Sequence, residues 1–412
     1  MRKSNACSTF DALNFTEMNL IFFDNNHRQH LLPFTFTRPM ADLRCGILTI
    51  REKWQKLFSE TISSSITEKY LQQKFPLKTA VKNILIAGNL LPTKDLADAI
   101  STLKENEALI NGEDLLAICL NETATQDFTF DKKFEKTISF NADFQMITRA
   151  FQIFKWNDEQ IKFDFEILTK GKKSAPISTS NQIIAPENIF LEEEAMIECS
   201  ILNASNAKMY FAKDSEVMEG SMIRGSFALG EHSVLKMGAK IYGATTIGQH
   251  SKVGGEVNNS VIFGFSNKAH DGFMGNSVIG EWCNWGADTN NSNLKNNYEE
   301  VKLWSYVKQS FEKTGAQFCG LMMGDHSKCG INTMFNTGTV VGVSANIFGA
   351  GFPRNFIADF SWGGAQGVTS YQVSKAIQTA KLVYERRGLV FDEVEQDIFA
   401  HIFEATKASR GE

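Results

Sequence analysis

The pattern of hydrophobic and polar positions changes its period once along the chain. Up to about position 170, short apolar runs alternate with segments of helical spacing. The runs at 19–23 and 84–87 are short and almost wholly apolar, which predicts buried strands. Their alternation with helical segments predicts an α/β domain with a mainly parallel sheet. The predicted helices lie at 47–58, at 67–72 and from Thr93 to Ile100.

A longer helical stripe and a linker mark the end of this half. The spacing of the stripe predicts one amphipathic helix that closes the domain. Its residues are Phe151, Phe154, Ile161, Phe165 and Leu168. The segment 171–176 is rich in Gly, Lys, Ser and Pro, and it predicts a linker to the next domain.

From about position 186 the hydrophobic period becomes six. Two series of mostly large apolar residues follow this step, and the residue two positions before each member of the first series is small in all but one case. Such hexapeptide repeats predict a triangular β-helix, in which each apolar residue points into a narrow interior. We expect it to be left-handed, an exception to the usual right-handed crossover. The series are Val217, Ile223, Leu229, Leu235, Ile241, Ile247 and Val253, then Met323, Cys329, Phe335, Val341 and Ile347.

Two segments depart from the six-residue step. The stretch 290–315 has no such register and predicts a loop thrown out of the β-helix wall, where binding residues are common. Near the C-terminus helical spacing returns, with Asp392 as the N-cap of the second helix. The expected organisation is a disordered leader at 1–17, an α/β domain at 18–175, a β-helix at 186–365 and a helical tail at 366–412.

Composition and charge exclude several classes of function. The 412 residues carry a net charge of −5, which argues against an extended nucleic-acid footprint. No apolar run approaches the roughly 18 residues that span a bilayer, so we expect no membrane partner. The 7 Cys are scattered without a CxxC pair. This is typical of reduced thiols, and we expect a cytoplasmic protein.

The densest group of chemically capable residues lies at 254–298, inside the predicted β-helix. It holds His270, many carboxamides and two lysines among glycines, more polar groups than a β-helix wall requires. Acetyl transfer to an amine needs a base, and His has a pKa near working pH. Carboxamide or backbone N–H groups can stabilise the oxyanion, and basic residues can hold a sugar phosphate. The simpler alternative is that His270 is a solvated turn residue and that the asparagines only supply turns.

The run 254–298 resembles the acetyltransferase segment of the bacterial bifunctional N-acetylglucosamine-1-phosphate uridylyltransferase/glucosamine-1-phosphate N-acetyltransferase family. That family has a glutamate, a polar stretch, a catalytic His, glycines, an aliphatic-Gly pair and Asn-x-Gly-Ala. The matching residues here are Glu256, His270, Gly272, Gly275, Ile279-Gly280 and Asn284-Trp285-Gly286-Ala287. The whole chain resembles a divergent form of this enzyme found in Bacteroidetes and related bacteria, through Arg38-Pro39 and the runs 43–54, 266–273 and 292–296.

The resemblance implies that His270 is the general base. It also implies that Lys236 takes the place of a phosphate-binding Arg. Asn258 stands where the family has a phosphate-contacting Lys, and Phe273 and Leu294 stand where it has Tyr. The substrate-contacting residues that follow from the resemblance are Lys236, Glu256, Asn258, Phe273, Asn284, Asn293 and Lys295.

The α/β half lacks the Gly-x-Gly-Thr-Arg-Met loop with which the usual nucleotidyltransferase begins. Backbone N–H groups of such a loop cradle a triphosphate. Here the strand at 19–23 is followed by Asp24-Asn25-Asn26-His27, and Asp24 is a candidate Mg²⁺ ligand. The alternative is that the charges of this half are ordinary surface charges on a degenerate domain. The candidate phosphate-binding residues are Arg38, Arg44, Arg51 and Lys53.

Together these features predict a nucleotidyltransferase-like, Rossmann-like α/β domain, a left-handed β-helix acetyltransferase domain and a short helical tail. The resemblance implies acetyl transfer from acetyl-CoA to glucosamine-1-phosphate and uridylyl transfer from UTP to N-acetylglucosamine-1-phosphate with Mg²⁺, which makes UDP-N-acetylglucosamine. Two alternatives remain: a single-activity sugar-1-phosphate nucleotidyltransferase whose β-helix serves oligomerisation, and a non-enzymatic scaffold.

The outward positions of the β-helix carry more apolar side chains than a monomer usually exposes. This predicts a homotrimer, as in the acetyltransferases that the chain resembles, with the loop at 290–315 able to reach a neighbouring subunit. The apolar outward residues are Met218, Met222, Val234, Met237, Tyr242 and Phe263.

Overall fold

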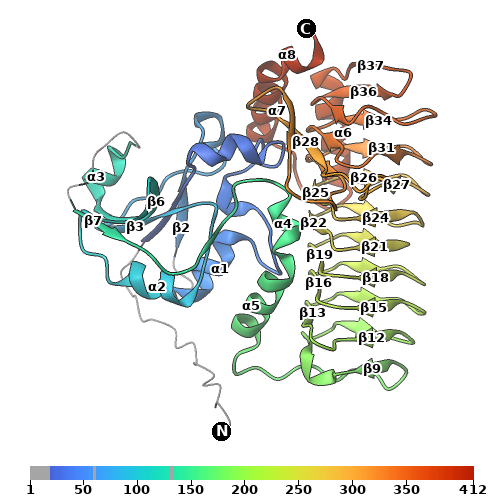
Figure 1. Ribbon diagram of the computed structural model, residues 1–412, viewed down its shortest axis with the longest axis horizontal. Helices are drawn as coiled ribbons and strands as arrows, with labels where there is room; N and C mark the ends of the chain where they lie inside the picture. Colours follow the sequence, from blue (N-terminus) through green and yellow to red (C-terminus); the bar gives the residue numbers. More distant parts are fainter. Residues whose placement is uncertain (1–18, 59–61, 130–133, 135) are drawn as a thin grey trace.

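The computed structural model describes residues 19–58, 62–129, 134 and 136–412. The leader predicted at 1–17 lies outside the described residues. The chain forms an α/β domain, a β-helix beside it, and a helical tail that packs on one end of the β-helix (Figure 1). The predicted fold class is therefore confirmed.

The α/β domain is built on a six-stranded sheet in the order β2-β1-β3-β6-β5-β7. All strands run in one direction except β6, which is antiparallel to both of its neighbours. The prediction of a mainly parallel sheet is thus correct. The strands are β1 Asn19–Phe23, β2 Ser63–Ile66, β3 Lys82–Ala87, β5 Glu107–Asn111, β6 Asp114–Asn121 and β7 Lys136–Ser139, with a separate pair β4 Leu90–Leu91 and β8 Gln145–Met146.

The helices of this domain differ from the predicted ones at their ends. The first begins at Ile50 because Thr49 and Glu52 form a reciprocal capping box. The segment predicted as a helix at 67–72 is only a 3₁₀ turn at Lys69–Leu71. The helix predicted from Phe151 is divided at Trp156. The helices are α1 Ile50–Leu57, α2 Lys94–Ser101, α3 Glu122–Gln126, α4 Gln152–Lys155 and α5 Asn157–Thr169.

The β-helix has three faces of parallel strands, which we name A, B and C. Face A consists of β10 Ile189–Leu191, β13 Met209–Phe211, β16 Phe227–Leu229, β19 Thr245–Ile247, β22 Val261–Gly264, β25 Val278–Glu281, β30 Met322–Met323, β33 Val340–Val341 and β35 Phe356–Ile357. Face B consists of β11 Met196–Ile197, β14 Glu216–Val217, β17 Val234–Leu235, β20 Lys252–Val253, β23 Asn267–Lys268, β26 Asn284–Trp285, β31 Lys328–Cys329, β34 Asn346–Ile347 and β36 Ser361–Gly364, with β37 Gly367–Ser370 antiparallel at its end. Face C consists of β9 Gln182–Ile184, β12 Ile201–Asn203, β15 Met222–Arg224, β18 Lys240–Tyr242, β21 Glu256–Asn258 and β24 Phe273–Gly275, and the pair β27 Asn290–Asn291 and β32 Met334–Phe335 extends it.

All twelve apolar residues of the two six-residue series are buried, as predicted. Between the two series, the spacing from one inward residue to the next falls below six residues at three places, because some turns of the β-helix are tighter. The inward positions in this interval are Val257, Ile262, Lys268, Met274, Ile279, Trp285 and Asn291. Two polar side chains, Lys268 and Asn291, therefore occupy the interior at the level of His270.

Face A is covered by the α/β domain. Outward residues of face A, among them Val261, Phe263 and Val278, belong to the same hydrophobic cluster as the core of that domain. The Phe263 ring lies 5.4 Å from the ring of Phe34 and is 2% exposed. The prediction that Phe263 is an exposed residue available to a trimer interface is therefore wrong, because the chain's own α/β domain buries it.

The segment 290–315 contains a β-hairpin outside the wall. Its first two residues remain in the wall as β27, and a hairpin follows, β28 Lys302–Ser305 with β29 Ser310–Lys313. Leu303, Trp304 and Tyr306 pack against the shared cluster of the α/β domain and face A. The chain thus leaves the wall after β27 and re-enters it at β30, as predicted, and the hairpin between them folds onto its own chain.

The tail covers the edge between faces A and B. Residues with positive φ at successive turns of this edge stack on one another: His232, His250, Phe265 and Trp282. Tyr384 of the tail extends the stack, with its ring 4.0 Å from that of Trp282. The tail helices are α6 Val373–Glu385, α7 Glu393–Ala405, capped by Asp392 as predicted, and α8 Lys407–Arg410. Among the described helices, none has the length and apolar character to cross a bilayer.

Candidate active site

His270 lies at the edge where faces B and C meet. It follows β23 and precedes β24, and its side chain is exposed. Glycines let the backbone fold tightly around it. Gly272 has a φ of 113°, and a Cβ there would lie 2.1 Å from the carbonyl oxygen of Thr289. A Cβ at Gly255 would lie 2.9 Å from the His270 carbonyl oxygen. The sequence thus presents an imidazole on a closely packed turn, open to solvent.

Lys268 holds this turn from inside the β-helix. It takes the inward position that Val253 takes one turn earlier, and it is 3% exposed. Its ammonium donates hydrogen bonds of 2.9 Å to the carbonyl oxygens of Gly254 and His270. Burial lowers the pKa of Lys268 to about 8, and the nearby Asp271 opposes this shift. A charged group in an aliphatic column is costly, so its two bonds indicate a positioning role.

We expect Lys268→Met to impair the chemistry of His270 more than it impairs folding. Met fills the interior slot and removes the cost of burying an amine, but the His270 carbonyl loses its donor. If His270 is the base, kcat for acetyl transfer should fall by about tenfold or more, with the KM for acetyl-CoA changed less. Steady-state kinetics and thermal unfolding of the variant check this. A stable variant with wild-type kcat would contradict the positioning role.

A groove on face B begins one residue before His270. It has a volume of about 510 Å³, and Ala269 forms part of its floor. Four basic residues line it and no carboxylate does, among the residues that the structure describes. The Asn267 side-chain oxygen is buried there without a hydrogen-bond partner in the described part of the chain. The basic residues are Lys252 and Lys328 of face B and Arg386 and Arg387 at the end of α6.

The electrostatics of this groove favour an anion. Burial lowers the pKa of Lys328, whose ammonium donates to the His326 carbonyl oxygen. Burial and the adjacent Arg386 lower the pKa of Arg387. Positive charges held close together without carboxylates are unfavourable by themselves, and a phosphate group would relieve their repulsion.

Face C holds four of the predicted substrate contacts. Glu256 pairs in register with Phe273, and its carboxylate accepts a 2.6 Å bond from the Tyr242 hydroxyl. Burial and this bond raise the pKa of Tyr242 to about 12. Asn258 donates to the Tyr242 carbonyl, and Asn293 donates to the Asn276 side chain. The Asn293 side chain also lies close to Gly275, and Gly275 is the residue that pairs in register with Asn258.

The remaining predicted contacts are divided between different surfaces. Lys236 lies on face B beside Gly254, and Asn284 lines the face B groove. Lys295 lies in a separate cavity near the hairpin, and its ammonium donates to the Glu300 carbonyl oxygen. Within one chain, His270 therefore stands between two half-sites on faces B and C, and Lys295 is not part of either.

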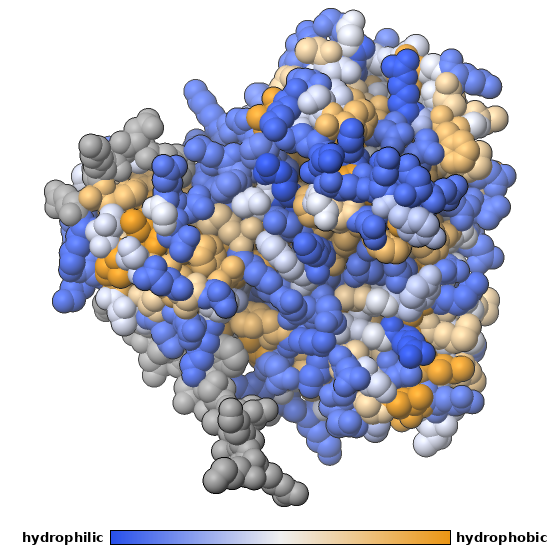
Figure 2. All heavy atoms as spheres, viewed as in Figure 1, coloured by the Kyte–Doolittle hydropathy of each residue, from blue (hydrophilic) through white to orange (hydrophobic). Residues whose placement is uncertain are grey.

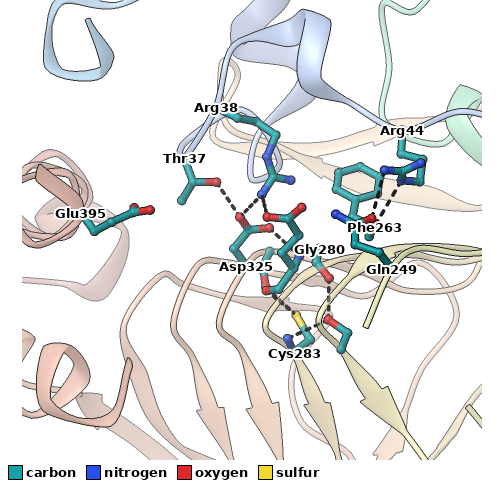
Figure 3. Close-up of polar contacts among 12 residues, drawn as sticks. Thr37, Arg38, Arg44, Gln249, Phe263, Gly280, Cys283, Asp325 and Glu395 are labelled. Atoms are coloured by element: carbon teal, nitrogen blue, oxygen red, sulfur yellow. Dashed lines mark hydrogen bonds and ion pairs between the residues drawn. The ribbon is translucent and has the colours of Figure 1, made fainter. Parts of the chain in front are cut away.

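The predicted phosphate-binding residues of the α/β domain are largely engaged elsewhere. Arg38 is 7% exposed and forms ion pairs with Asp325 and with Glu281, the latter at 3.1 Å (Figure 3). Thr37 donates a 2.6 Å bond to the same Asp325 carboxylate. Arg44 donates 3.1 Å bonds to the Phe263 carbonyl and to the Gln249 side chain. Both arginines thus join the α/β domain to the β-helix, which favours a structural role for them.

Arg51 and Lys53 are also paired inside the domain. Arg51 forms a two-point contact with Asp42, at 2.6 and 3.1 Å, and it donates to Ser65 on β2. Lys53 lies 2.5 Å from Asp164, and neither side chain is exposed to solvent. None of the four predicted basic residues presents an open cation to a triphosphate in this arrangement.

Asp24 does not fit the predicted magnesium site. One carboxylate oxygen accepts bonds from Arg28 and Thr67, at 2.9 and 2.6 Å, and the other accepts the Met40 N–H at 2.8 Å. Burial raises the pKa of Asp24, although Arg28 acts in the opposite direction. Three of the roughly four acceptor sites of this carboxylate are occupied and the Arg28 guanidinium already balances its charge, so we derive no step through a metal at Asp24.

The carboxyl ends of β1 and β3 hold polar residues that the sequence did not single out. Asn25 donates a 3.0 Å bond to Asn89, and His27 lies 3.5 Å from Asp114. Ligands of open α/β sheets bind at such carboxyl ends. The sequence could have indicated this polar group, because the segments that hold Asn25 and Asn89 each follow a predicted strand directly.

Comparison with known proteins finds one family match and several relatives of part of the chain. A model of the sugar nucleotidyl transferase family matches residues 20–173. A bifunctional sugar-1-phosphate nucleotidylyltransferase/acetyltransferase of Sulfurisphaera tokodaii is 32% identical over 143 residues, 34% of this chain and 35% of the relative. The bifunctional protein GlmU of Methanocaldococcus jannaschii is 29% identical over 136 residues, 33% of this chain and 28% of that protein. The aligned part thus spans about a third of the length of these relatives.

Two solved structures resemble the chain weakly. A UDP-N-acetylglucosamine acyltransferase aligns with 57% of this chain and 89% of its own, at 10% identity and a TM-score of 0.20. The Arabidopsis UDP-N-acetylglucosamine acyltransferase aligns with 57% of this chain and 94% of its own, at 12% identity and a TM-score of 0.19. Scores at this level add nothing to the fold described above. The family match and the curated relatives agree with the predicted resemblance: residues 20–173 match the sugar nucleotidyl transferase family, and about a third of this chain is similar to bifunctional sugar-1-phosphate nucleotidylyltransferase/acetyltransferases.

Proposed function

We propose that the chain is a bifunctional transferase that acetylates glucosamine-1-phosphate from acetyl-CoA and transfers uridylyl from UTP to N-acetylglucosamine-1-phosphate. The observation that carries this proposal is the placement of an exposed His270 beside a basic groove, in a chain whose residues 20–173 match a sugar nucleotidyl transferase model. A purely structural β-helix needs neither the groove nor the polar residues around His270. The cytoplasmic location stays a prediction.

In the acetyl-transfer step His270 acts as the general base. It takes a proton from the ammonium of the amino sugar, and the freed lone pair attacks the thioester carbonyl carbon. The carbon–sulfur bond then breaks and CoA leaves as the thiol after it takes up a proton. The sugar phosphate approaches from face C, where Glu256 and Asn258 lie. The thioester approaches along face B, since Ala269 connects the groove to His270.

The four cations of the face B groove bind the phosphates of acetyl-CoA in this proposal. We expect Arg386→Ala with Arg387→Ala to raise the KM for acetyl-CoA by about tenfold or more, because charge-assisted bonds to phosphate are lost. The matched comparison is acetyl-pantetheine, which lacks the phosphorylated nucleotide. The rate of acetyl transfer from acetyl-pantetheine should be the same in the wild type and in the variant. An equal loss with both donors would contradict phosphate binding in the groove.

The two half-sites around His270 favour completion by a second copy. Apolar side chains gather over the first turns of the β-helix in Figure 2, and Ile184, Ile201 and Met222 of face C are 51%, 41% and 45% exposed. We infer a homotrimer in which faces of neighbouring β-helices meet, about three times 46 kDa. Multi-angle light scattering tests the mass. A monodisperse, fully active monomer would contradict the shared site.

One assay tests both activities. Purified protein is mixed with glucosamine-1-phosphate, acetyl-CoA, UTP and Mg²⁺, and CoA and pyrophosphate are measured separately. Release of both supports the bifunctional enzyme. Pyrophosphate alone, with N-acetylglucosamine-1-phosphate supplied, would favour a nucleotidyltransferase whose β-helix serves oligomerisation. Release of neither product would favour a scaffold.

A further inference from the structure

A second cavity lies on the other side of the β-helix, between the hairpin β28–β29 and the last turns of the wall. Its volume is about 740 Å³, within the usual range for small-molecule sites. It shares no lining residue with the face B groove. The residues around it are Lys295, Lys302, Trp304, Phe311, Thr337, Arg354, Asn355 and Phe356.

The charge of this cavity is uniformly positive. Three basic residues line it, and no carboxylate does among the residues that the structure describes. Lys302 and Arg354 are exposed, and neither makes a side-chain hydrogen bond or ion pair within the described part of the chain. The Lys295 ammonium donates a hydrogen bond to the Glu300 carbonyl oxygen. A neutral carbonyl does not compensate the positive charge of this ammonium. Three uncompensated cations on one cavity favour a phosphorylated ligand.

Aromatic rings form the other part of the wall. Trp304 stacks on Phe356 with ring centroids 4.3 Å apart, and Phe311 meets Trp304 edge-on at 5.3 Å. Phe311 is 42% exposed, so one ring remains available to a ligand. Phe311 is therefore the stacking surface that this wall offers to a ligand.

We propose that this cavity binds a nucleoside diphosphate. The base packs against the exposed Phe311 ring, and the phosphates meet Lys302 and Arg354. This combination of stacking surface and cations discriminates a nucleotide from a simple anion. The site is separate from the acetyl-transfer groove and does not depend on the proposed chemistry at His270.

Hydrogen–deuterium exchange with UDP as the probe localises the binding. UDP should slow exchange in peptides that cover 302–313 and 352–356. The midpoint of this protection should move to at least about tenfold higher UDP concentration in the Lys302→Ala, Arg354→Ala double variant. Both residues are exposed, so the variant should fold normally. Lys381→Ala, an exposed cation of α6 outside the cavity, is the matched control and should bind as wild type.

A further arm tests the chemistry of the ligand. Uridine and inorganic pyrophosphate should each protect the hairpin much less than UDP. Absence of protection by UDP, or equal midpoints in wild type and double variant, would overturn the site. Pyrophosphate as effective as UDP would overturn the nucleotide assignment.

Discussion

His270→Ala should reduce acetyl transfer by about 10²–10⁴-fold, the usual loss when a general base is removed. The imidazole is exposed at the edge between faces B and C, and its side chain bonds to no other group within the described residues, so its removal should leave the fold intact. Release of CoA from acetyl-CoA in the presence of glucosamine-1-phosphate measures the effect. Release of pyrophosphate, measured with N-acetylglucosamine-1-phosphate supplied, should be unchanged, because that reaction belongs to the α/β domain in our proposal.

His232→Ala is the matched control for this experiment. His232 is another half-exposed histidine of the β-helix, but it lies on the edge between faces A and B. Its removal should change neither product. Near-normal CoA release by His270→Ala would contradict the assignment of the base, and an equal loss in both variants would point to a general effect on the β-helix.

Arg38→Ala should destabilise the protein by about 3–5 kcal/mol, the cost of removing one partner from a buried ion pair. Asp325 is 2% exposed, and Arg38 is the cation that joins it and Glu281 to the α/β domain. Without the guanidinium, two carboxylates lie close together in a partly buried contact. Urea unfolding, followed by a signal from each half, measures the loss.

The contrasting control is the exposed pair of Lys308 and Glu312 on the hairpin. Their side chains are 62% and 23% exposed, so Lys308→Ala should change the free energy of unfolding by less than about 1 kcal/mol. The double variant Arg38→Met, Asp325→Leu should recover part of the Arg38→Ala loss, because apolar residues of similar size replace the ion pair. An Arg38→Ala protein of wild-type stability with an increased KM for UTP would instead restore the phosphate-binding prediction.

The sequence indicated the site around His270, but it did not indicate that Lys268 supports the His270 turn from the interior. The step of six from Val217 to Val253 identifies the inward column without any structure. It does not reach Lys268, because the turns that follow are shorter and the register slips. Lys268 therefore looked like one more polar residue of the wall. A search that allowed steps of four or five residues would have found a lysine on the inward column.

The basic residues of the α/β half show the opposite case. Arg38, Arg44, Arg51 and Lys53 are near one another in sequence, and this clustering predicted a common ligand. Their partners are Asp325, Gln249, Asp42 and Asp164, three of which are more than 100 positions away. No local pattern marks such pairs, since each partner is an ordinary polar residue in its own segment.

The sequence by itself determined the β-helix, two strands of the α/β sheet, the helices capped at Thr93 and Asp392, and the location of His270 on the wall. These features depend on local periodicity, capping and glycine, which act over a few residues. Only the tertiary structure decided that the α/β domain covers face A, that the hairpin folds onto its own chain, and that Phe263 and Arg38 are buried between the halves. The physical reason is that burial and ion pairing depend on which surfaces meet, and residues far apart in sequence supply those surfaces.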